Sequence, residues 1–465
     1  MIKPTIFRDY DIRGIVGKEF DSSDAKKFGQ AFGTLIQEFS GPNIIVGRDN
    51  RFTSDSIASY FISGVLSTGC NVVDVGLALR PMIQAGIYHE SFDGGAMITG
   101  SHSEPEYNGI KFFTRKGKPF FGERIKNIKK LCYSGEFKQG NGEVGYSNLA
   151  GLYYRDITQK IELKSYKKVV IDCGNGTAGK YLPHLFHRLG CDVVPLYTNL
   201  DGSFPNHTPN PENRVNMLDL SQKVLEEEAD LGIAFDTDGD RFGIIDEKGN
   251  HHASDRTLVL LARKVLENHP QGKIIFDVKC SYVLEREIKK ARGTPIMIRT
   301  GHPYFYQRME EDKEIVLGGE LSGHFLYQEN NLFDDAAFAA AKILKIASEQ
   351  EQPLSESYDS IPKTAHTPEI KASCPDEDKF EIVEEVRQEY EKELGVLEYD
   401  GARVIFSKTA WALIRASNTT PCLSLRFEAK NKKTLRKIML DIKEKLKKYP
   451  QVDLKQLNLF LEAGK

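Results

Sequence analysis

Three carboxylates lie close together in a short segment between two apolar runs. Asp236, Asp238 and Asp240 directly follow the strand-like run 231–235, and a second strand-like run, 242–245, comes after them. Alternate side chains in so short a loop can point at one centre, and carboxylates this close repel each other unless a cation neutralises them. An oxygen-only ligand set suits a hard cation, Mg²⁺ before Ca²⁺ or Mn²⁺. The segment is therefore predicted to be a metal-binding loop.

A calcium-binding helix–loop–helix motif is the main alternative for this loop. Glu247 lies eleven residues after Asp236, where that motif has its bidentate ligand. However, the obligatory turn glycine of the motif would fall at Arg241, and strand-like runs flank the loop in place of helices. The calcium motif is therefore excluded. An acidic turn without a metal remains as the other alternative.

A small hydroxyl residue lies in a second polar loop, segment 98–109. Ser101 follows Thr99 and Gly100 and stands beside His102. Because glycine permits backbone angles that hold a side chain out at a loop tip, Ser101 is expected to lie at such a tip. Taken alone, this segment could be an ordinary turn. Three further polar loops, the metal loop among them, favour a functional one.

Two more polar loops have groups that suit a sugar and a phosphate. In segment 318–324, Glu320 and Ser322 are two residues apart, so in an extended segment both side chains face the same way and suit a vicinal diol. Segment 415–421 combines a guanidinium, hydroxyls, an amide and free backbone N–H groups, which is the donor set that a phosphate needs. Taken alone, the first could be a glycine turn and the second a polar hairpin.

The composition is that of a soluble globular protein too long for one core. The 465 residues are 40% hydrophobic and 28% charged, and this length predicts roughly three or four domains. Lys plus Arg (63) nearly balance Asp plus Glu (66), so no global field favours nucleic acid or an anionic membrane as a partner. Any anionic ligand must be held by a local basic cluster.

The seven cysteines are scattered, and no two of them form a C-x-x-C pair. That pattern predicts reduced thiols in a cytosolic protein and disfavours a disulfide framework or a zinc site. The first residues lack the apolar core of a signal peptide, and no run approaches the ~20 apolar residues of a membrane-spanning helix. A soluble, cytoplasmic protein is expected.

A strand–helix–strand unit recurs over residues 43–75, 168–196 and 273–298, and each helix closes near a glycine. Strands that alternate with helices predict largely parallel sheets covered by helices, and three copies predict three related α/β domains. In the last hundred residues, strand-like runs follow one another between two helix-like segments, which predicts a separate α+β domain. The helix-like segments are 376–394 and 433–448, and the strand-like runs are 402–406, 410–414 and 423–427.

Changes in composition predict where the domains meet. Segment 349–368, rich in Pro, Ser and Glu, is predicted to be a linker, and the glycine-containing segment 138–146 marks a weaker boundary. The predicted domains are 1–148 with the serine loop, 149–250 with the metal loop, 251–362 with the diol-binding loop and 363–465 with the phosphate-binding loop.

These four loops, in this order and on this domain pattern, resemble those of the α-D-phosphohexomutases over essentially the whole chain. The opening segment 7–14, Phe-Arg-Asp-Tyr-Asp-Ile-Arg-Gly, is also similar to the family's N-terminal signature. The resemblance implies a phosphoserine in the first loop, one Mg²⁺ ion in the second, sugar hydroxyls at the third and the substrate phosphate at the fourth. It also implies three related mixed-sheet α/β domains plus a C-terminal α+β domain around a central cleft.

Within the family, Gly-Glu-Leu-Ser-Gly-His in the third loop is similar to the phosphomannomutase/phosphoglucomutase type, whose usual form has Met at the position of Leu321. Phosphoglucosamine mutases typically have Gln there. Segment 201–207, Asp-Gly-Ser-Phe-Pro-Asn-His, and the fourth loop favour the same type. One residue departs from the family: Ser103 stands where Asn is usual. Its hydroxyl can still form hydrogen bonds, so reduced or rearranged positioning is expected, without loss of activity.

The resemblance implies reversible phosphoryl transfer between the 1- and 6-positions of hexose phosphates (mannose, glucose or both) through a phosphoserine and a hexose 1,6-bisphosphate. It implies a monomer or dimer whose fourth domain closes over the substrate. Phosphoglucosamine mutase, a metal-dependent sugar-phosphate phosphatase and a non-catalytic sugar-phosphate sensor are the alternatives.

The same resemblance assigns roles to individual residues. The implied catalytic residues are Ser101, His102, Lys111, Arg13 and Arg241. The implied substrate-binding residues are Tyr10, Lys279, His302, Glu320, Ser322, His324, Arg415, Ser417, Asn418 and Thr419. The implied metal ligands are Ser101, Asp236, Asp238 and Asp240.

Overall fold

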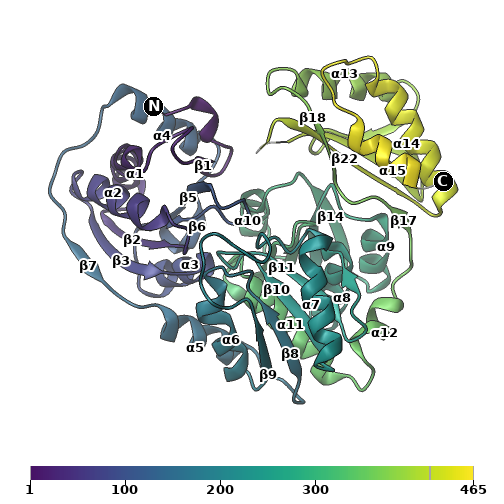
Figure 1. Ribbon diagram of the computed structural model, residues 1–465, viewed down its shortest axis with the longest axis horizontal. Coiled ribbons are helices and arrows are strands. Elements are labelled where there is room, and N and C mark those ends of the chain that lie inside the picture. The colour runs from purple at the N-terminus through teal and green to yellow at the C-terminus, as the bar shows by residue number, and fades with distance from the viewer. Residues whose placement is uncertain (1, 418–419, 464–465) are drawn as a thin grey trace.

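Four β-sheets follow one another along the chain in the computed structural model, which describes residues 2–417 and 420–463. Each sheet with its helices is called a unit below, numbered in chain order. Figure 1 shows the first unit (purple) on one side, the second and third units in the middle, and the fourth unit (green to yellow) on the other side.

The first sheet is mixed, with order β1-β5-β4-β2-β3-β7 and β6 on β5. β2 pairs in parallel with β3 and β4, whereas β5 runs antiparallel to β4 and β1. Helices α1, α2 and α4 cover one face and α3 the other. The strands are β1 (Ile12–Ile15), β2 (Asn43–Arg48), β3 (Asn71–Leu77), β4 (Gly94–Ile98), β5 (Tyr107–Thr114), β6 (Lys118–Pro119) and β7 (Val144–Tyr146). The helices are α1 (Ala25–Phe39), α2 (Ser54–Leu66), α3 (Arg80–His89) and α4 (Glu123–Ser134).

The second sheet, β12-β11-β10-β8-β9, has the metal loop at the turn between its antiparallel strands β10 and β11. β8 runs parallel to both β9 and β10. The strands are β8 (Lys168–Asp172), β9 (Asp192–Leu196), β10 (Leu231–Phe235), β11 (Phe242–Asp246) and β12 (His251–His252). The helices are α5 (Ala150–Lys160), α6 (Ala178–Arg188) and α7 (Leu218–Glu226).

The third sheet, β14-β13-β15-β16, pairs β13 in parallel with β14 and β15 and ends in the antiparallel strand β16. The strands are β13 (Lys273–Asp277), β14 (Thr294–Ile298), β15 (Ile315–Gly319) and β16 (Phe325–Tyr327). The helices are α8 (Ser254–Asn268), α9 (Tyr282–Lys290), α10 (His302–Glu311), α11 (Ala336–Glu349) and α12 (Leu354–Asp359).

The fourth sheet is antiparallel, with order β17-β22-β21-β20-β19 and β18 on β22. The strands are β17 (Ala365–His366), β18 (Ile370–Ser373), β19 (Gly395–Leu397), β20 (Ala402–Ser407), β21 (Ala410–Ala416) and β22 (Cys422–Ala429). The helices are α13 (Lys379–Glu391), α14 (Lys432–Leu446) and α15 (Lys455–Ala463).

Apolar burial joins the first three units extensively, whereas the fourth has a core of its own and only a small apolar cluster, at Val278, Trp411 and Leu413, shared with the third. One continuous core of buried side chains runs through the second and third units and reaches α3 of the first. The outer face of the first sheet has a second core, and the fourth unit has a third. Because burial of apolar surface is the main stabilising contribution to folding, the first three units form one framework to which the fourth is attached.

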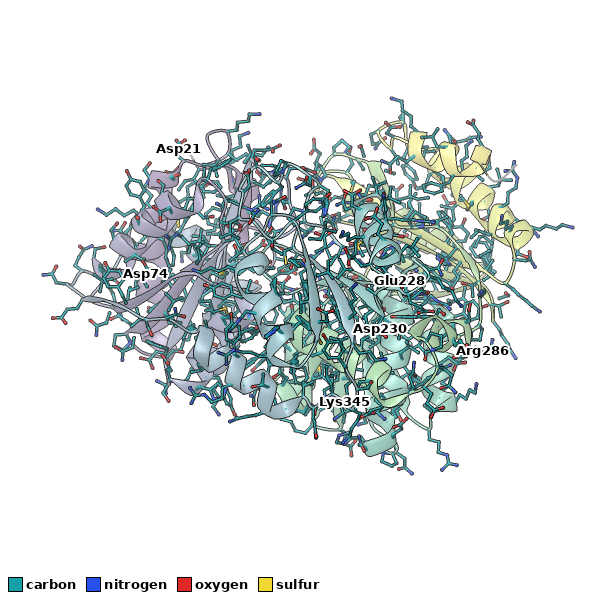
Figure 2. The ribbon with its side chains drawn as sticks, turned by 60° about the horizontal axis from the view of Figure 1, so that its bottom comes forward. Asp21, Asp74, Glu228, Asp230, Arg286 and Lys345 are labelled. Atoms are coloured by element: carbon teal, nitrogen blue, oxygen red, sulfur yellow. The ribbon has the colours of Figure 1, made fainter. Side chains whose placement is uncertain are left out.

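Charged side chains of both signs are distributed over the surface. In Figure 2, Asp21 and Asp74 lie over the purple first unit, whereas Arg286 and Lys345 lie over the third. Within the described residues, no helix combines the length and the apolar content needed to cross a membrane.

The structure confirms the predicted fold class and corrects two expectations about segments. The expectation that 349–368 is a linker is wrong for part of it, because α12 forms there and the ring of Tyr358 stacks on that of His252, with centroids 3.5 Å apart. The expectation of largely parallel sheets is also wrong in detail. Antiparallel strands return beside the parallel ones, so the first three sheets are mixed.

Helices α1 and α2 cross at two glycines. A Cβ added at Gly64 would lie 2.1 Å from the backbone oxygen of Lys26, and one at Gly29 would lie 2.1 Å from that of Phe61. The helices can approach this closely because neither glycine has a side chain.

We therefore expect Gly64→Ala to lower the free energy of unfolding by about 1–3 kcal/mol through overpacking. Gly151→Ala in α5 is the matched control, because nothing lies within 4 Å of the added Cβ, and it should be neutral or stabilise by up to about 1 kcal/mol. Urea denaturation of the two variants checks this. Equal stability of both variants would contradict the close helix contact.

Candidate active site

The serine of the first loop is buried just beyond the end of β4. Ser101 has no exposed surface and a φ of +50°, a left-handed conformation that residues other than glycine rarely adopt. Its hydroxyl donates to Asp236 Oδ2 at 2.8 Å and lies 3.3 Å from His102 Nδ1. Ser101 lies in the loop between β4 and β5 as expected, but the role of the glycine differs. The left-handed residue is Ser101 itself, and a Cβ at Gly100 would lie 2.6 Å from Arg51 Cζ, so the glycine permits a close approach.

The three aspartates of the metal loop converge without any exposed surface. One carboxylate oxygen from each of Asp236, Asp238 and Asp240 lies within 4.8 Å of the others. Lys111, which β5 brings from the first sheet, donates to Asp238 Oδ2 at 2.7 Å and to Asp240 Oδ2 at 2.5 Å. Although burial lowers it, these two carboxylates raise the pKa of Lys111. The lysine is therefore a fixed cation of the cluster.

This cluster suits a hard divalent cation. Asp238 Oδ1 and Asp240 Oδ1 are buried and have no hydrogen-bond partner among the described residues, and buried acceptors without a partner are costly. Burial first, and then the charges of its two neighbours, raise the pKa of Asp236 well above its usual value, as expected for crowded carboxylates. With the hydroxyl of Ser101 beside them, the aspartates form an oxygen-only donor set that fits Mg²⁺.

Arg241 connects the metal loop to two histidines. Its Nε donates to His324 Nε2 at 3.0 Å, and its Nη1 lies 3.4 Å from His102 Nε2. The ring centroid of His302 lies 4.8 Å from that of His324 and 5.2 Å from that of Tyr10. Burial first, and then neighbouring cations, hold the pKa values of His102 and His302 well below their usual range. Both rings are therefore neutral near neutral pH.

Two residues that the sequence analysis missed complete this network. Asp334 Oδ2 lies 2.7 Å from His324 Nδ1 and 2.7 Å from Arg80 Nη1, while Arg80 Nε lies 3.4 Å from Asp240 Oδ2. The carboxylate favours a proton on Nδ1 of His324 and leaves Nε2 as the acceptor. Arg80 begins α3 just after a strand end, which is a usable sequence signal. Asp334 has no comparable signal.

Glu320 and Ser322 lie in a tight turn between β15 and β16. The expectation of an extended segment is wrong, because the backbone N–H of Glu320 donates to the oxygen of His324 at 2.9 Å. Glu320 Oε1 accepts from the backbone N–H of Gly301 at 2.7 Å, and burial raises the pKa of Glu320 to about 7. The turn still brings the buried side chains of Glu320, Ser322 and His324 close together in the chain.

The cations predicted to bind the sugar and the phosphate have carboxylate partners, which the sequence analysis missed. Lys279 Nζ lies 3.2 Å from Glu369 Oε2, and Arg415 Nε donates to Asp400 Oδ2 at 2.9 Å. Asp400 also accepts from the backbone N–H of Thr300 at 3.2 Å, and so links the third and fourth units. Although burial raises it, the charge of Lys279 lowers the pKa of Glu369 to about 2.

The residue that departs from the family pattern contacts an arginine near the serine. Arg13 Nη1 donates to Ser103 Oγ at 3.4 Å, and Arg13 Nη2 donates to Asp11 Oδ2 at 2.7 Å. The hydroxyl of Ser103 therefore still takes part in hydrogen bonding, as expected.

The fourth loop follows β21. Ser417 Oγ lies 2.9 Å from Thr420 Oγ1, and the oxygen of Ser417 accepts from Lys379 Nζ at 2.6 Å. The other two residues predicted in this loop, Asn418 and Thr419, lie outside the described residues.

The chain matches four domain families in the order in which the units occur. Residues 4–139, 152–249 and 253–365 match the families described as phosphoglucomutase/phosphomannomutase, alpha/beta/alpha domains I, II and III. Residues 369–445 match the phosphoglucomutase/phosphomannomutase C-terminal domain. The chain is also 38% identical over 445 residues to the phosphomannomutase/phosphoglucomutase of Pseudomonas aeruginosa, which covers 95% of this chain and 96% of that protein.

The chain belongs to the phosphoglucomutase/phosphomannomutase family. It is similar as well to the phosphoglucomutase of Neisseria meningitidis, with 36% identity over 455 residues that cover 96% of this chain and 98% of that protein. A crystal structure of a phosphoglucomutase/phosphomannomutase family protein from Burkholderia thailandensis superposes with a TM-score of 0.90 at 33% identity, over 97% of this chain and 99% of that chain. Membership confirms the predicted family and the predicted enzyme class.

Proposed function

We propose that this chain interconverts the 1- and 6-phosphates of glucose and mannose, with Ser101 as the residue that carries the phosphoryl group. The contact between Ser101 Oγ and Asp236 Oδ2, 2.8 Å long, carries the proposal. It brings a hydroxyl from the first unit to the acidic cluster of the second. Lys111 and Arg241 add positive charge beside the same cluster. A hydroxyl beside an acidic cluster and two cations suits phosphoryl transfer, which depends on positioning and on neutralising charge.

In the proposed first transfer, the free hydroxyl of the sugar attacks the phosphorus of phosphorylated Ser101. The bond from phosphorus to Ser101 Oγ breaks as the new bond to the sugar oxygen forms. The net proton movement is from the sugar hydroxyl to Ser101 Oγ, and His102, whose Nδ1 lies 3.3 Å from Ser101 Oγ, is proposed to assist it. His302 is proposed to contact the substrate or to carry a proton. The product is a hexose 1,6-bisphosphate.

In the proposed second transfer, the bisphosphate has turned so that its other phosphate faces Ser101. Ser101 Oγ attacks that phosphorus, the bond from phosphorus to the sugar oxygen breaks, and the proton of Ser101 passes to the sugar oxygen. The product leaves with the first phosphate, and the serine is phosphorylated again. A single Mg²⁺ ion on Asp236, Asp238, Asp240 and the oxygen of Ser101 would neutralise charge on the transferring group. Between the two transfers, Glu320 in its buried turn accepts hydrogen bonds from sugar hydroxyls, with Ser322 and His324 beside it in the same turn.

The charge of the bisphosphate, about −3 to −4 for two phosphate groups, requires local cations in a chain whose net charge is −3. Arg13, Lys111, Arg241, Lys279 and Arg415 are the proposed set. All five come from loops or strands next to the loops described above, so they supply a local positive field that the overall composition does not. Tyr10, Ser417, Asn418 and Thr419 are proposed to complete the substrate contacts.

The predicted boundaries 1–148, 149–250, 251–362 and 363–465 stay a proposal, in which the last domain moves relative to the other three. Its contacts with the third unit are polar and apolar. Arg426 Nη2 donates to Asp255 Oδ2 at 3.2 Å and Arg403 Nη1 donates to the oxygen of Cys280 at 2.9 Å, while Val278 packs with Trp411 and Leu413 in a small buried cluster. Because the fourth unit has a core of its own, it is proposed to move as one body. Closure would keep the bisphosphate in place while it turns.

The proposed setting is the cytoplasm, where the seven cysteines, all free and buried, would stay reduced. The proposed assembly is a monomer or dimer. Neither nucleic acid nor a membrane is a proposed partner.

Three alternatives are separated by simple assays. A phosphatase would release inorganic phosphate from glucose 1-phosphate, and a sensor would bind it without turnover. A phosphoglucosamine mutase would prefer the glucosamine phosphate, but the chain has Leu321 where those enzymes typically have Gln. Formation of glucose 6-phosphate from glucose 1-phosphate without net release of phosphate supports the proposed function.

Replacement of the nucleophile is the first test. Ser101→Ala should abolish nearly all turnover while the fold and substrate binding remain, because the hydroxyl carries the phosphoryl group. Intact-mass measurement should show about 80 Da of added phosphoryl mass on active wild type and none at this site in the variant. Ser103→Ala is the matched control and should keep the added mass. Full activity in Ser101→Ala would refute the assignment.

Loss of a metal ligand is the second test. Asp238→Asn should weaken Mg²⁺ binding in calorimetry and lower turnover roughly 10²-fold or more, because metal stabilisation of the transferring charge contributes several kcal/mol. Asp246→Asn, a buried aspartate at the far end of the same β-hairpin, should leave Mg²⁺ affinity unchanged. If wild type treated with a chelator keeps its rate, the cluster is not a catalytic metal site.

Sugar specificity is the third test. Glucose and mannose differ only at C2, whereas Glu320 and Ser322 are proposed to hold the hydroxyls at C3 and C4, which both sugars share. We expect both 1-phosphates to be converted with kcat/KM values within roughly 10²-fold of each other, because no buried polar partner is left unpaired by either sugar. Glu320→Ala should impair both reactions in similar proportion. Wild type that converts one epimer and not the other would contradict dual specificity.

A further inference from the structure

A buried arginine uses its terminal N–H donors on the serine loop. The side chain of Arg51 has no exposed surface. Its Nη2 donates to the backbone oxygens of Ser101 at 2.7 Å and Ser103 at 2.6 Å. Its Nη1 donates to those of Glu104 at 2.6 Å and Tyr107 at 3.0 Å. These four oxygens lie on both arms of the loop, so one rigid planar group sets the shape of the loop around the serine.

The remaining donor of this arginine connects the loop to the end of β2. Arg51 Nε donates to Asp49 Oδ2 at 3.2 Å, and the same oxygen accepts from the backbone N–H of Gly100 at 3.2 Å. Gly100 has no side chain in the space that the guanidinium occupies, since a Cβ there would lie 2.6 Å from Arg51 Cζ. Asp49 and Arg51 therefore form hydrogen bonds with the backbone of the loop at Gly100, just before the serine, and at Ser101 and Ser103.

The second unit covers this arginine with segment 201–207. The ring centroid of Phe204 lies 4.9 Å from Arg51 Cζ, and Phe204 has a φ of +50°, a conformation that tertiary contacts must maintain. The chain approaches closely at Gly202, where a Cβ would lie 2.8 Å from the backbone oxygen of Asn50. A stacked guanidinium gains cation–π attraction and loses rotational freedom.

We propose that Arg51 is a positioning residue for phosphoryl transfer, which fixes the serine loop, and that Phe204 of segment 201–207 holds its guanidinium in place. The inference rests on the proposed role of Ser101 as the phosphoryl carrier. Segment 201–207 thereby acquires a role in catalysis. The second unit holds both the metal loop and, through Phe204 and Arg51, the loop of the serine that must meet it.

The geometry of the serine explains why such support is needed. Ser101 has a φ of +50°, so its backbone conformation is strained and depends on the groups around it. Its Oγ must stay in reach of Asp236 in both transfers, and small displacements of reacting groups reduce rates strongly. The guanidinium bonds only to backbone oxygens of the loop, so its effect on the reaction acts through the position of Ser101.

Arg51→Lys separates shape from charge, because lysine keeps the positive charge and loses the planar set of donors. In the folded, full-length variant, kcat should fall at least roughly tenfold, with KM for glucose 1-phosphate within about threefold of wild type. Dephosphorylated variant should also take up phosphoryl mass from glucose 1,6-bisphosphate at least about tenfold more slowly. Arg48→Lys is the matched control, since Arg48 ends β2 three residues before Arg51 and pairs with Asp55 at the surface, and both rates should stay near wild type.

Phe204→Leu tests the contact between the Phe204 ring and the Arg51 guanidinium without removing a buried charge. The control is Phe186→Leu in the core of the second unit, where the ring packs on Phe235 at 5.8 Å between centroids. At a temperature where circular dichroism shows both variants folded, only Phe204→Leu should lower kcat and phosphoryl uptake, by several-fold. If Arg51→Lys does not fold, the comparison of Phe204→Leu with Phe186→Leu alone decides whether Arg51 positions the serine loop.

Three results would overturn the inference: wild-type kcat and uptake in folded Arg51→Lys, an effect of Arg51→Lys confined to KM, or equal kcat in Phe204→Leu and Phe186→Leu. None of these results touches the role of Ser101, which Ser101→Ala tests independently.

Discussion

The concentration of negative charge at a buried place is the constraint on which the rest of the structure depends. Asp236, Asp238 and Asp240 have no exposed surface, and charges taken out of water must be paired or must bind a cation. Lys111 and Arg80 reach them from the first unit, at distances of 2.5 Å and 3.4 Å from Asp240 Oδ2. The first unit cannot move away from the second without leaving buried charges unpaired. The serine loop, which lies between these two cations in the chain, is held at the cluster for the same reason.

The parts of this architecture with local signals could be predicted, and the parts made by packing could not. Two apolar runs around a polar loop predict the strands before and after the metal loop, β10 and β11. The three strand–helix–strand units are predicted by recurring apolar runs and by helices that each end near a glycine. Arg80 and Asp334, in contrast, are joined across 254 positions, and only the folded chain brings them to His324. The spacing of Glu320 and Ser322 predicts an extended segment, whereas the structure has a turn there. Residue spacing alone does not distinguish the two conformations.

The carboxylates that face the cations proposed to bind substrate would let a bisphosphate bind without being held too tightly. Lys279 is paired with Glu369 and Arg415 with Asp400. A substrate phosphate would compete with these carboxylates, so each contact exchanges one anion for another and contributes only the difference between them. Weak net attraction at each cation is useful when the same ligand must bind in two orientations. The sequence contains no sign of this arrangement, because Lys279 and Glu369 are 90 positions apart.

Rigidity and mobility are separated between the two sides of the site. The first three units share a continuous apolar core, and they contain the serine, the aspartates and the arginine Arg51 that shapes the serine loop. The fourth unit has its own core and meets the third through polar contacts and one small apolar cluster of Val278, Trp411 and Leu413. In the proposed mechanism, the serine needs a fixed position in both transfers, whereas the sugar needs room to turn. Attaching the proposed phosphate-binding loop to the separately folded unit would meet both needs, because a shift of the fourth unit would leave the distance between Ser101 and Asp236 unchanged.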